Sequence, residues 1–399
     1  MDSLTQMVLG AAVGEAVLGK KIGNRAIVWG GIAGTIPDLD VMANLFMSPI
    51  DALAFHRGFT HSIVFCLLTA ILLGWLVPKL YSFQHHKKVA VSSWTLLLTL
   101  FSGFIFFAGD VSFVKSGLTI VMFLGLMFLM YKRYSNPNYS TQMEATRLDW
   151  QRLFWWSLIT HPLLDCFTTY GTQIFLPFSD KRVAWDNISV ADPLYTIPLI
   201  LFLILAMSYR SKPNISKILN WTGLGISSCY MMFTVINKQH INNVFQSSLQ
   251  QNNIVYSRFM TTPTILNNVL WSGIAEGDTS YYFGQYSLLD SKKEFIINEV
   301  SKNHSLIKDD IETDYTLKKL KWFSNGYYKI NAPNQNEISW YDLRFGSFRL
   351  TPQDKDEFLF KFDIDVVNHK YELKKQPNRP RDGDISAMFS ALWNRIKGI

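Results

Sequence analysis

Long apolar runs separated by short polar connections dominate the first 236 residues of the chain. Most of these runs are long enough, at roughly 16–20 residues, to cross or nearly cross the hydrocarbon core of a bilayer as helices. The pattern predicts a mostly α fold, a polytopic helical membrane bundle of about 7–8 apolar segments. The segments are Leu4–Gly19, Ile27–Phe46, Ser62–Leu80, Ser92–Gly109, Val114–Tyr131, Leu153–Phe178, Leu194–Tyr209 and Ile218–Ile236.

Two of these segments carry prolines and ionisable residues amid apolar neighbours. Ile27–Phe46 contains Pro37, and Leu153–Phe178 contains Pro162. Irregular backbone at membrane depth persists only where protein or water satisfies its polar groups. We therefore expect these two segments to be broken or re-entrant helices that line a polar site.

The pattern changes after Ile236. Residues 1–236 hold 29 charged residues, whereas the shorter stretch 237–399 holds 40. Alternating runs there predict strands, and apolar residues at helical spacing over Ile385–Ile396 predict a final helix. The chain should thus contain a transmembrane helical domain, 1–236, and a soluble α+β domain, 237–399. The predicted strands are Tyr281–Leu288, Gly326–Ile330, Ile338–Leu350 and Glu357–Val366.

The distribution of charge favours a membrane over nucleic acid as the partner. Of the net charge of +7, residues 1–236 contribute +5, with most of their basic residues in short connections between the apolar runs, while residues 237–399 hold 21 basic and 19 acidic residues. Basic connections face the cytoplasm in inner-membrane proteins. This predicts a multi-pass protein of the bacterial inner (cytoplasmic) membrane with an extracytoplasmic C-terminal domain, and no nucleic acid as partner.

Three polar clusters within or beside the apolar segments carry the candidate chemistry. Burying a carboxylate in an apolar region is costly, and a divalent cation offsets that cost for several ligands at once. Carboxylate and neutral imidazole are the ligands of a zinc or manganese site. We expect a divalent metal ion, zinc or manganese, to be bound by Asp38, Asp40, His56, His61, His161 and Asp165.

Simpler roles are open for each cluster taken alone. Asp38 and Asp40 could cap a helix after Pro37 or pair with Arg57, and His161 and Asp165, four residues apart, could hydrogen-bond each other. The joint occurrence of three such clusters favours the metal site, because an apolar context penalises each idle polar group.

The order of these motifs resembles the YdjM-like family of bacterial membrane-bound, metal-dependent hydrolases. The resemblance covers roughly Met1–Ala206 and rests on several short motifs in a fixed order. It implies a divalent-metal hydrolase centre in the inner membrane, and the family's distant similarity to zinc-dependent phospholipase C implies phosphoester substrates. Many members have Thr-His near the start, so Gln6 implies the loss of one ligand here. The motifs are Met1-Asp2-Ser3-Leu4-Thr5-Gln6 with Gly10 and Gly14, Pro37-Asp38-Leu39-Asp40, His56-Arg57-Gly58-Phe59-Thr60-His61-Ser62, and His161-Pro162-Leu163-Leu164-Asp165 with Thr169-Tyr170-Gly171 and Pro177-Phe178-Ser179.

These observations favour a membrane-embedded metal-dependent hydrolase acting on a lipid or lipid-linked phosphoester. Asp38, Arg57 and Asp165 are the expected catalytic residues: a carboxylate acts as general base, and Arg57 steadies developing negative charge. Two other functions fit the same pattern. A transporter or ion pathway would use intramembrane Asp and His, and a non-catalytic scaffold would hold a structural metal.

Overall fold

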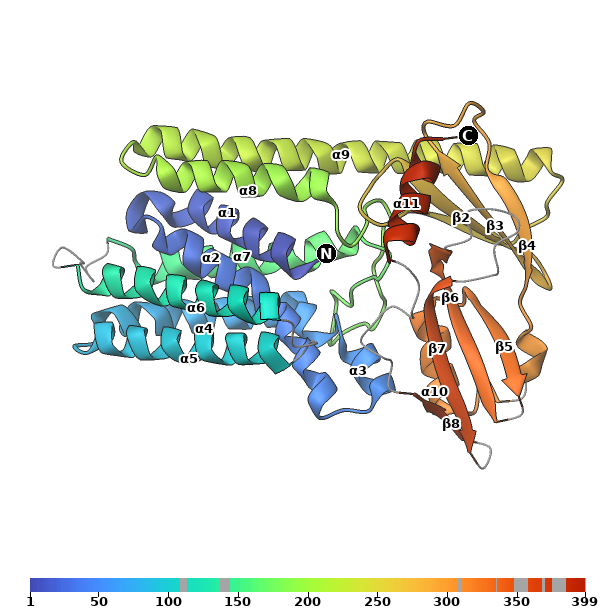
Figure 1. The fold of residues 1–399 in the computed structure, drawn as a ribbon, viewed down its shortest axis with the longest axis horizontal. Helices are drawn as coiled ribbons and strands as arrows, with labels where there is room; N and C mark the ends of the chain where they lie inside the picture. Colours follow the sequence, from blue (N-terminus) through green and yellow to red (C-terminus); the bar gives the residue numbers. More distant parts are fainter. Residues whose placement is uncertain are drawn as a thin grey trace. The chain divides into compact units, whose positions relative to one another are not determined.

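The computed structural model describes residues 1–107, 113–136, 144–307, 310–334, 336–347, 358–367, 370–374 and 385–398 (Figure 1). The chain forms two compact units, one made of Met1–Thr69 and Leu153–Ile399, the other of Ala70–Arg152. The predicted domain boundary after Ile236 falls inside one continuous helix, α9 (Pro213–Gln251). The division into 1–236 and 237–399 therefore stays a prediction.

Helices make up most of the described chain before residue 252. α8 and α9 lie side by side and pack on α1, which in turn packs on α2 (Figure 1). The helical elements of this region are α1 (Ser3–Ile22), α2 (Arg25–Thr35), η1 (Pro37–Leu45), α3 (Pro49–Phe55), η2 (Phe59–His61), α4 (Ile63–Ser82), α5 (His86–Phe107), α6 (Phe113–Tyr134), α7 (Arg147–Cys166), α8 (Pro193–Ser208) and α9.

The predicted bundle of about 7–8 membrane segments is wrong. Among the described residues, only α4 is a helix long and apolar enough to cross a membrane; α2 and η1, which meet at a 46° bend, add a second if they count as one broken span. α1 and α7 carry polar side chains directed into the protein, and α8 is too short, at 16 residues. The multi-pass topology lacks support for the same reason, and the side on which the C-terminal region lies stays a prediction.

Four glycines allow α1 and α2 to cross at close range. A Cβ atom on Gly10 would lie 2.5 Å from the carbonyl oxygen of Gly30, and one on Gly34 would lie 2.5 Å from that of Gln6. Only glycine fits at such backbone contacts. The crossing fixes the end of α2 against α1. This places the Gly34 carbonyl within hydrogen-bonding distance of His161 on α7.

Two antiparallel four-stranded sheets follow α9, each with its strands in sequence order. The predicted strands coincide with β3, β5, β6 and β7 and the predicted last helix with α11, although residues 348–350 and 357 of the predictions lie outside the described residues. The elements are β1 (Arg258–Pro263), β2 (Leu270–Glu276), β3 (Ser280–Ser287), β4 (Ile296–Ser301), η3 (His304–Ile307), α10 (Tyr315–Phe323), β5 (Tyr328–Asn334), β6 (Glu337–Ser347), β7 (Phe358–Val367), β8 (Lys370–Leu373) and α11 (Ile385–Ile396).

The loop after α7 joins the helices to the sheets. Thr169 Oγ1 lies 2.6 Å from Thr262 Oγ1 of β1, and Asn268 Nδ2 donates to the Asn187 carbonyl at 2.8 Å. Both contacts are buried. The sheets thereby hold the loop that follows His161 and Asp165, the two polar residues of α7.

Candidate metal centre

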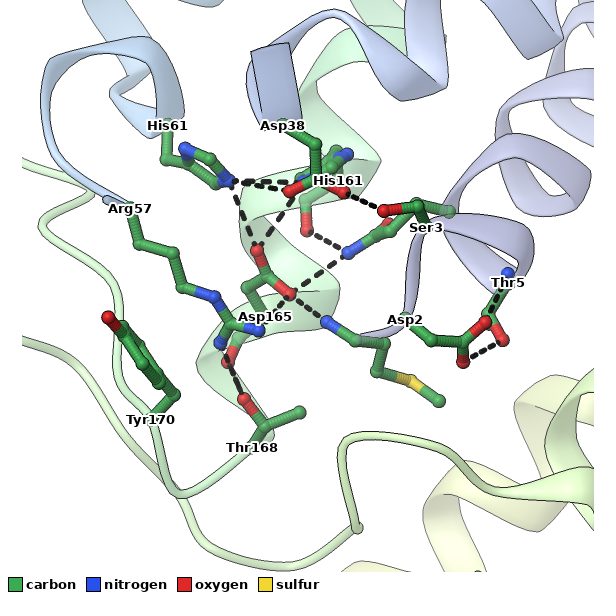
Figure 2. A network of polar contacts seen from close by, with 12 residues as sticks. Asp2, Ser3, Thr5, Asp38, Arg57, His61, His161, Asp165, Thr168 and Tyr170 are labelled. Atoms are coloured by element: carbon green, nitrogen blue, oxygen red, sulfur yellow. Dashed lines mark hydrogen bonds and ion pairs between the residues drawn. The ribbon is translucent and has the colours of Figure 1, made fainter. Parts of the chain in front are cut away.

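Four of the predicted ligands meet inside the first compact unit, although they come from three separate elements (Figure 2). Asp38 lies at the start of η1, where α2 ends at the bend before Pro37. His61 is the last residue of η2. His161 and Asp165 lie one turn apart on α7, which continues through Pro162 and so presents both side chains on one face.

Asp38, His61 and His161 form a compact ligand triad. His61 Nε2 and His161 Nε2 are 3.1 Å apart, and Asp38 Oδ1 lies 3.6 and 3.3 Å from them, respectively. A tetrahedral zinc ion with bonds of about 2.0–2.1 Å has ligands about 3.3 Å apart. The spacing of these three atoms therefore already suits a divalent ion.

Asp165 offers a fourth oxygen on the other side of the histidine pair. Its Oδ2 lies 3.4 Å from both Nε2 atoms, is buried, and has no hydrogen-bond partner among the described residues. Its Oδ1 is fully engaged: it accepts from Gln6 Nε2 at 3.0 Å, lies 3.2 Å from Arg57 Nη2, and contacts the amino terminus of Met1. Oδ2 is thus the oxygen left for a cation.

The hydrogen bonds behind the two imidazoles direct their lone pairs at each other. His161 Nδ1 is 2.6 Å from the Gly34 carbonyl, which can only accept, so this nitrogen carries the proton. His61 Nδ1 faces Thr60 Oγ1 at 3.1 Å and Asp40 Oδ2 at 3.3 Å. The two nitrogen lone pairs thus lie close to Asp38 Oδ1 and to Asp165 Oδ2, and the atoms of Asp38, His61 and His161 all lie within 4.8 Å of one another. Such a cluster of acceptors requires a cation, either a metal ion or a proton.

Asp40 and His56 lie behind the triad instead of within it. Asp40 is buried and accepts from the backbone N–H of Arg57 and the hydroxyl of Thr60, both at 3.0 Å. His56 Nδ1 bonds Asp40 Oδ1 at 2.8 Å, and its side chain is 31% exposed. Of the six predicted ligands, the structure brings four together and places these two where they orient His61.

Arg57 sets the charge balance next to Asp165. Its backbone is left-handed, with φ of +58°, and this turn directs the side chain into the protein. The guanidinium donates to Thr168 Oγ1 at 2.8 Å and packs 4.8 Å from the centre of the Tyr170 ring. Arg57 therefore offsets part of the negative charge of the Asp165 carboxylate.

Gln6 lies inside the site. It is buried, and its amide nitrogen donates to Asp165 and contacts the His161 carbonyl at 3.2 Å, while its Oε1 has no partner among the described residues.

Two groups at the site were missed by the sequence analysis: Ser3, which donates to Asp38 Oδ2 at 2.8 Å, and the backbone carbonyl of Gly34. The only sequence signal for Ser3 was its place in the N-terminal motif. A backbone carbonyl leaves no signal in the sequence, because every residue has one.

Metal binding should compete with a proton on His61. Burial lowers the pKa of His61, but its contacts with Asp165, Asp38 and Asp40 outweigh burial and raise the pKa to about 10. In the metal-free protein this proton stabilises the fold fully below the ordinary pKa of 6.5, and the stabilisation is lost as the pH rises toward 10.

We expect zinc binding near neutral pH to release about one proton. Isothermal titration calorimetry in buffers of different ionisation enthalpy measures this number directly. The comparison is the number of protons released by folded His61→Ala protein under the same conditions. Zinc binding by the wild type without proton release would contradict a protonated His61 in the metal-free state.

Comparison with known proteins identifies one family. The family model described as YdjM inner membrane protein matches residues 1–241, which is more than half of the chain and includes every residue of the metal centre. The comparisons with curated proteins and with solved structures gave no significant match.

Proposed function

Because this chain belongs to the YdjM inner membrane protein family, we propose that it is a membrane hydrolase whose divalent metal ion is held by Asp38, His61 and His161. The observation that supports the proposal most strongly is the convergence of these three ligand atoms within 3.1–3.6 Å of one another. Two histidines and one carboxylate are also a common ligand set of catalytic zinc, which leaves a coordination position for water or substrate.

The chain's own residues supply the remaining functions. A bound divalent ion would polarise the scissile ester and lower the pKa of a water molecule. Asp165, whose Oδ2 has no hydrogen-bond partner among the described residues, is placed to accept a proton from that water. Arg57 keeps Asp165 in position and sets a positive charge beside the site, where negative charge develops in the transition state.

A lipid or lipid-linked phosphoester fits the surroundings of the site. Asp38 is 15% exposed, whereas the side chains of His61, His161 and Asp165 are inaccessible, so a substrate would approach from the side of η1. Several apolar side chains of η1 and the following turn are exposed, Phe46 at 86%. His61 also lies two residues before α4, the helix best suited to cross the membrane. These features support a site near the membrane surface with an apolar approach.

Turnover of model substrates by the metal-loaded protein tests the proposal. We expect purified full-length protein in lipid nanodiscs to hydrolyse a chromogenic phosphodiester after zinc or manganese loading. Arg57→Met should lower kcat by about 100-fold while the bound metal stays, because Arg57 is not a ligand. His240→Ala, on the exposed face of α9, is the matched control.

The second candidate function is a structural metal site. If Asp165 Oδ2 completes four protein ligands, the centre is closed and no water is activated. Stoichiometric metal without turnover of phosphomonoesters, phosphodiesters or carboxylic esters would favour this function and contradict the hydrolase.

A further inference from the structure

A second site of a different kind lies on the other face of α7. An apolar groove of about 570 Å³ runs between α1, α7 and α9, with Tyr195 of α8 at its side. His161 and Asp165 face the metal centre, whereas Trp156, Thr160 and Leu163 of the same helix face this groove. The groove is therefore separate from the metal site and has no part in the chemistry proposed there.

The length of the groove follows from the residues of α9 that line it. Its lining extends along α9 from Met231 to Trp221, ten residues, or about 15 Å at 1.5 Å per residue. This length is half of the roughly 30 Å hydrocarbon thickness of a bilayer. One acyl chain of one leaflet matches the groove in length, and its lining is predominantly apolar.

The end of the groove has the composition of a membrane interface. Two tryptophans, Trp156 and Trp221, line this end and are about half exposed, at 51% and 53%. One turn beyond the lining residues, Lys20 follows Ala16 on α1 and Lys217 precedes Trp221 on α9, and both lysines are exposed. Tryptophan followed by lysine is the order found where hydrocarbon gives way to lipid headgroups.

An ion pair shows that the C-terminal end of α1 lies close to the N-terminal end of α9. Arg210, just before α9, donates to Glu15 of α1 at 2.8 Å and to Asn24 Oδ1 at 2.7 Å. Lys20 and Lys217 therefore lie at the same end of the groove, and both are exposed. Arg210 itself is engaged with Glu15, so the lysines carry the charge available to a ligand.

We propose that this groove binds one anionic phospholipid, with an acyl chain between α1, α7 and α9 and the headgroup phosphate at Lys20 and Lys217. The apolar length, the tryptophans and the paired lysines each match one part of such a molecule. A purely apolar helix would match the lining but leave the lysines without a partner of opposite charge.

Native mass spectrometry of the purified full-length protein tests the proposal. We expect one phosphatidylglycerol to remain bound per chain after detergent exchange, while phosphatidylcholine is lost. Ser228→Phe fills the groove and should abolish retention. Cys229→Phe, at the neighbouring exposed position outside the groove, should not. Lys20→Gln and Lys217→Gln should each weaken retention about fivefold, whereas Lys293→Gln leaves it unchanged.

Three results would overturn the proposal. They are equal retention in Ser228→Phe and Cys229→Phe, equal retention of the two lipids, and a dimer mass in place of a lipid adduct. The last would show that a second copy of the chain covers the groove. His61→Ala separates this proposal from the hydrolase, because it should lose the metal and keep the lipid.

Discussion

Replacing His61 with alanine is expected to lower the affinity of the protein for zinc by more than about 100-fold. Loss of a group that merely orients a ligand costs about 10–100-fold, and His61 is itself at the centre of the cluster. Its Nε2 lies 3.1–3.6 Å from the ligand atoms of Asp38, His161 and Asp165. Chelator competition with metal quantification by mass spectrometry measures the change.

Asp40→Asn distinguishes a ligand from a positioning residue in the same assay. Asp40 lies behind the triad, 3.3 Å from His61 Nδ1 and bonded to the backbone of Arg57, so its neutralisation should cost about 10-fold. His240→Ala should cost nothing, since His240 is exposed on α9. Equal zinc affinities of folded His61→Ala and His240→Ala proteins would remove His61 from the metal site.

The sequence was sufficient to single out Asp38, His61 and His161, the candidate metal triad, because each is a polar residue in an apolar setting. It could not tell Asp38 from Asp40. η1 is a 3₁₀ helix of about three residues per turn, so residues two apart point in directions about 120° apart. Asp38 therefore faces the histidine pair, while Asp40 faces the turn at Arg57. This difference depends on the helix type, which Pro37 alone does not specify.

Apolar runs predicted the helices better than they predicted the membrane. α1 follows its predicted segment closely, whereas α7 begins six residues before its predicted segment, 153–178, and ends twelve residues before that segment does; in both helices the polar residues lie against other parts of the protein. A run of apolar residues predicts that a helix face is removed from water, but it does not distinguish burial by lipid from burial by another helix. Among the described helices, only α4, which has few polar residues along its length, is by itself both long enough and apolar enough to cross a membrane.

The long helix α9 shows a related limit. Its apolar pattern ends at Ile236, where the charge density of the chain rises, and this predicted a domain boundary. The helix nevertheless continues to Gln251, and its last turns bury Ile241, Phe245 and Leu249 against the first sheet. A change in composition thus marks a change in surroundings without a break in the backbone.

Gly34→Ala is expected to damage both the fold and the metal centre. A Cβ atom at this position would lie 2.5 Å from the Gln6 carbonyl and 3.1 Å from Gly10 Cα, both backbone atoms that cannot rotate away. Such overpacking costs about 1–3 kcal/mol of unfolding free energy. The Gly34 carbonyl also accepts from His161 Nδ1 at 2.6 Å, so separation of the two helices should lower zinc affinity about 10–100-fold.

Gly31→Ala on the same helix provides the matched control. Its added Cβ would make only ordinary contacts, the nearest at 3.5 Å, so it keeps the helix crossing intact. Chemical unfolding in detergent and chelator competition, applied to both variants, separate loss of stability from loss of metal. Since Gly34 touches the site only through the helix crossing and one carbonyl, wild-type zinc affinity in Gly34→Ala would show that the crossing does not position His161.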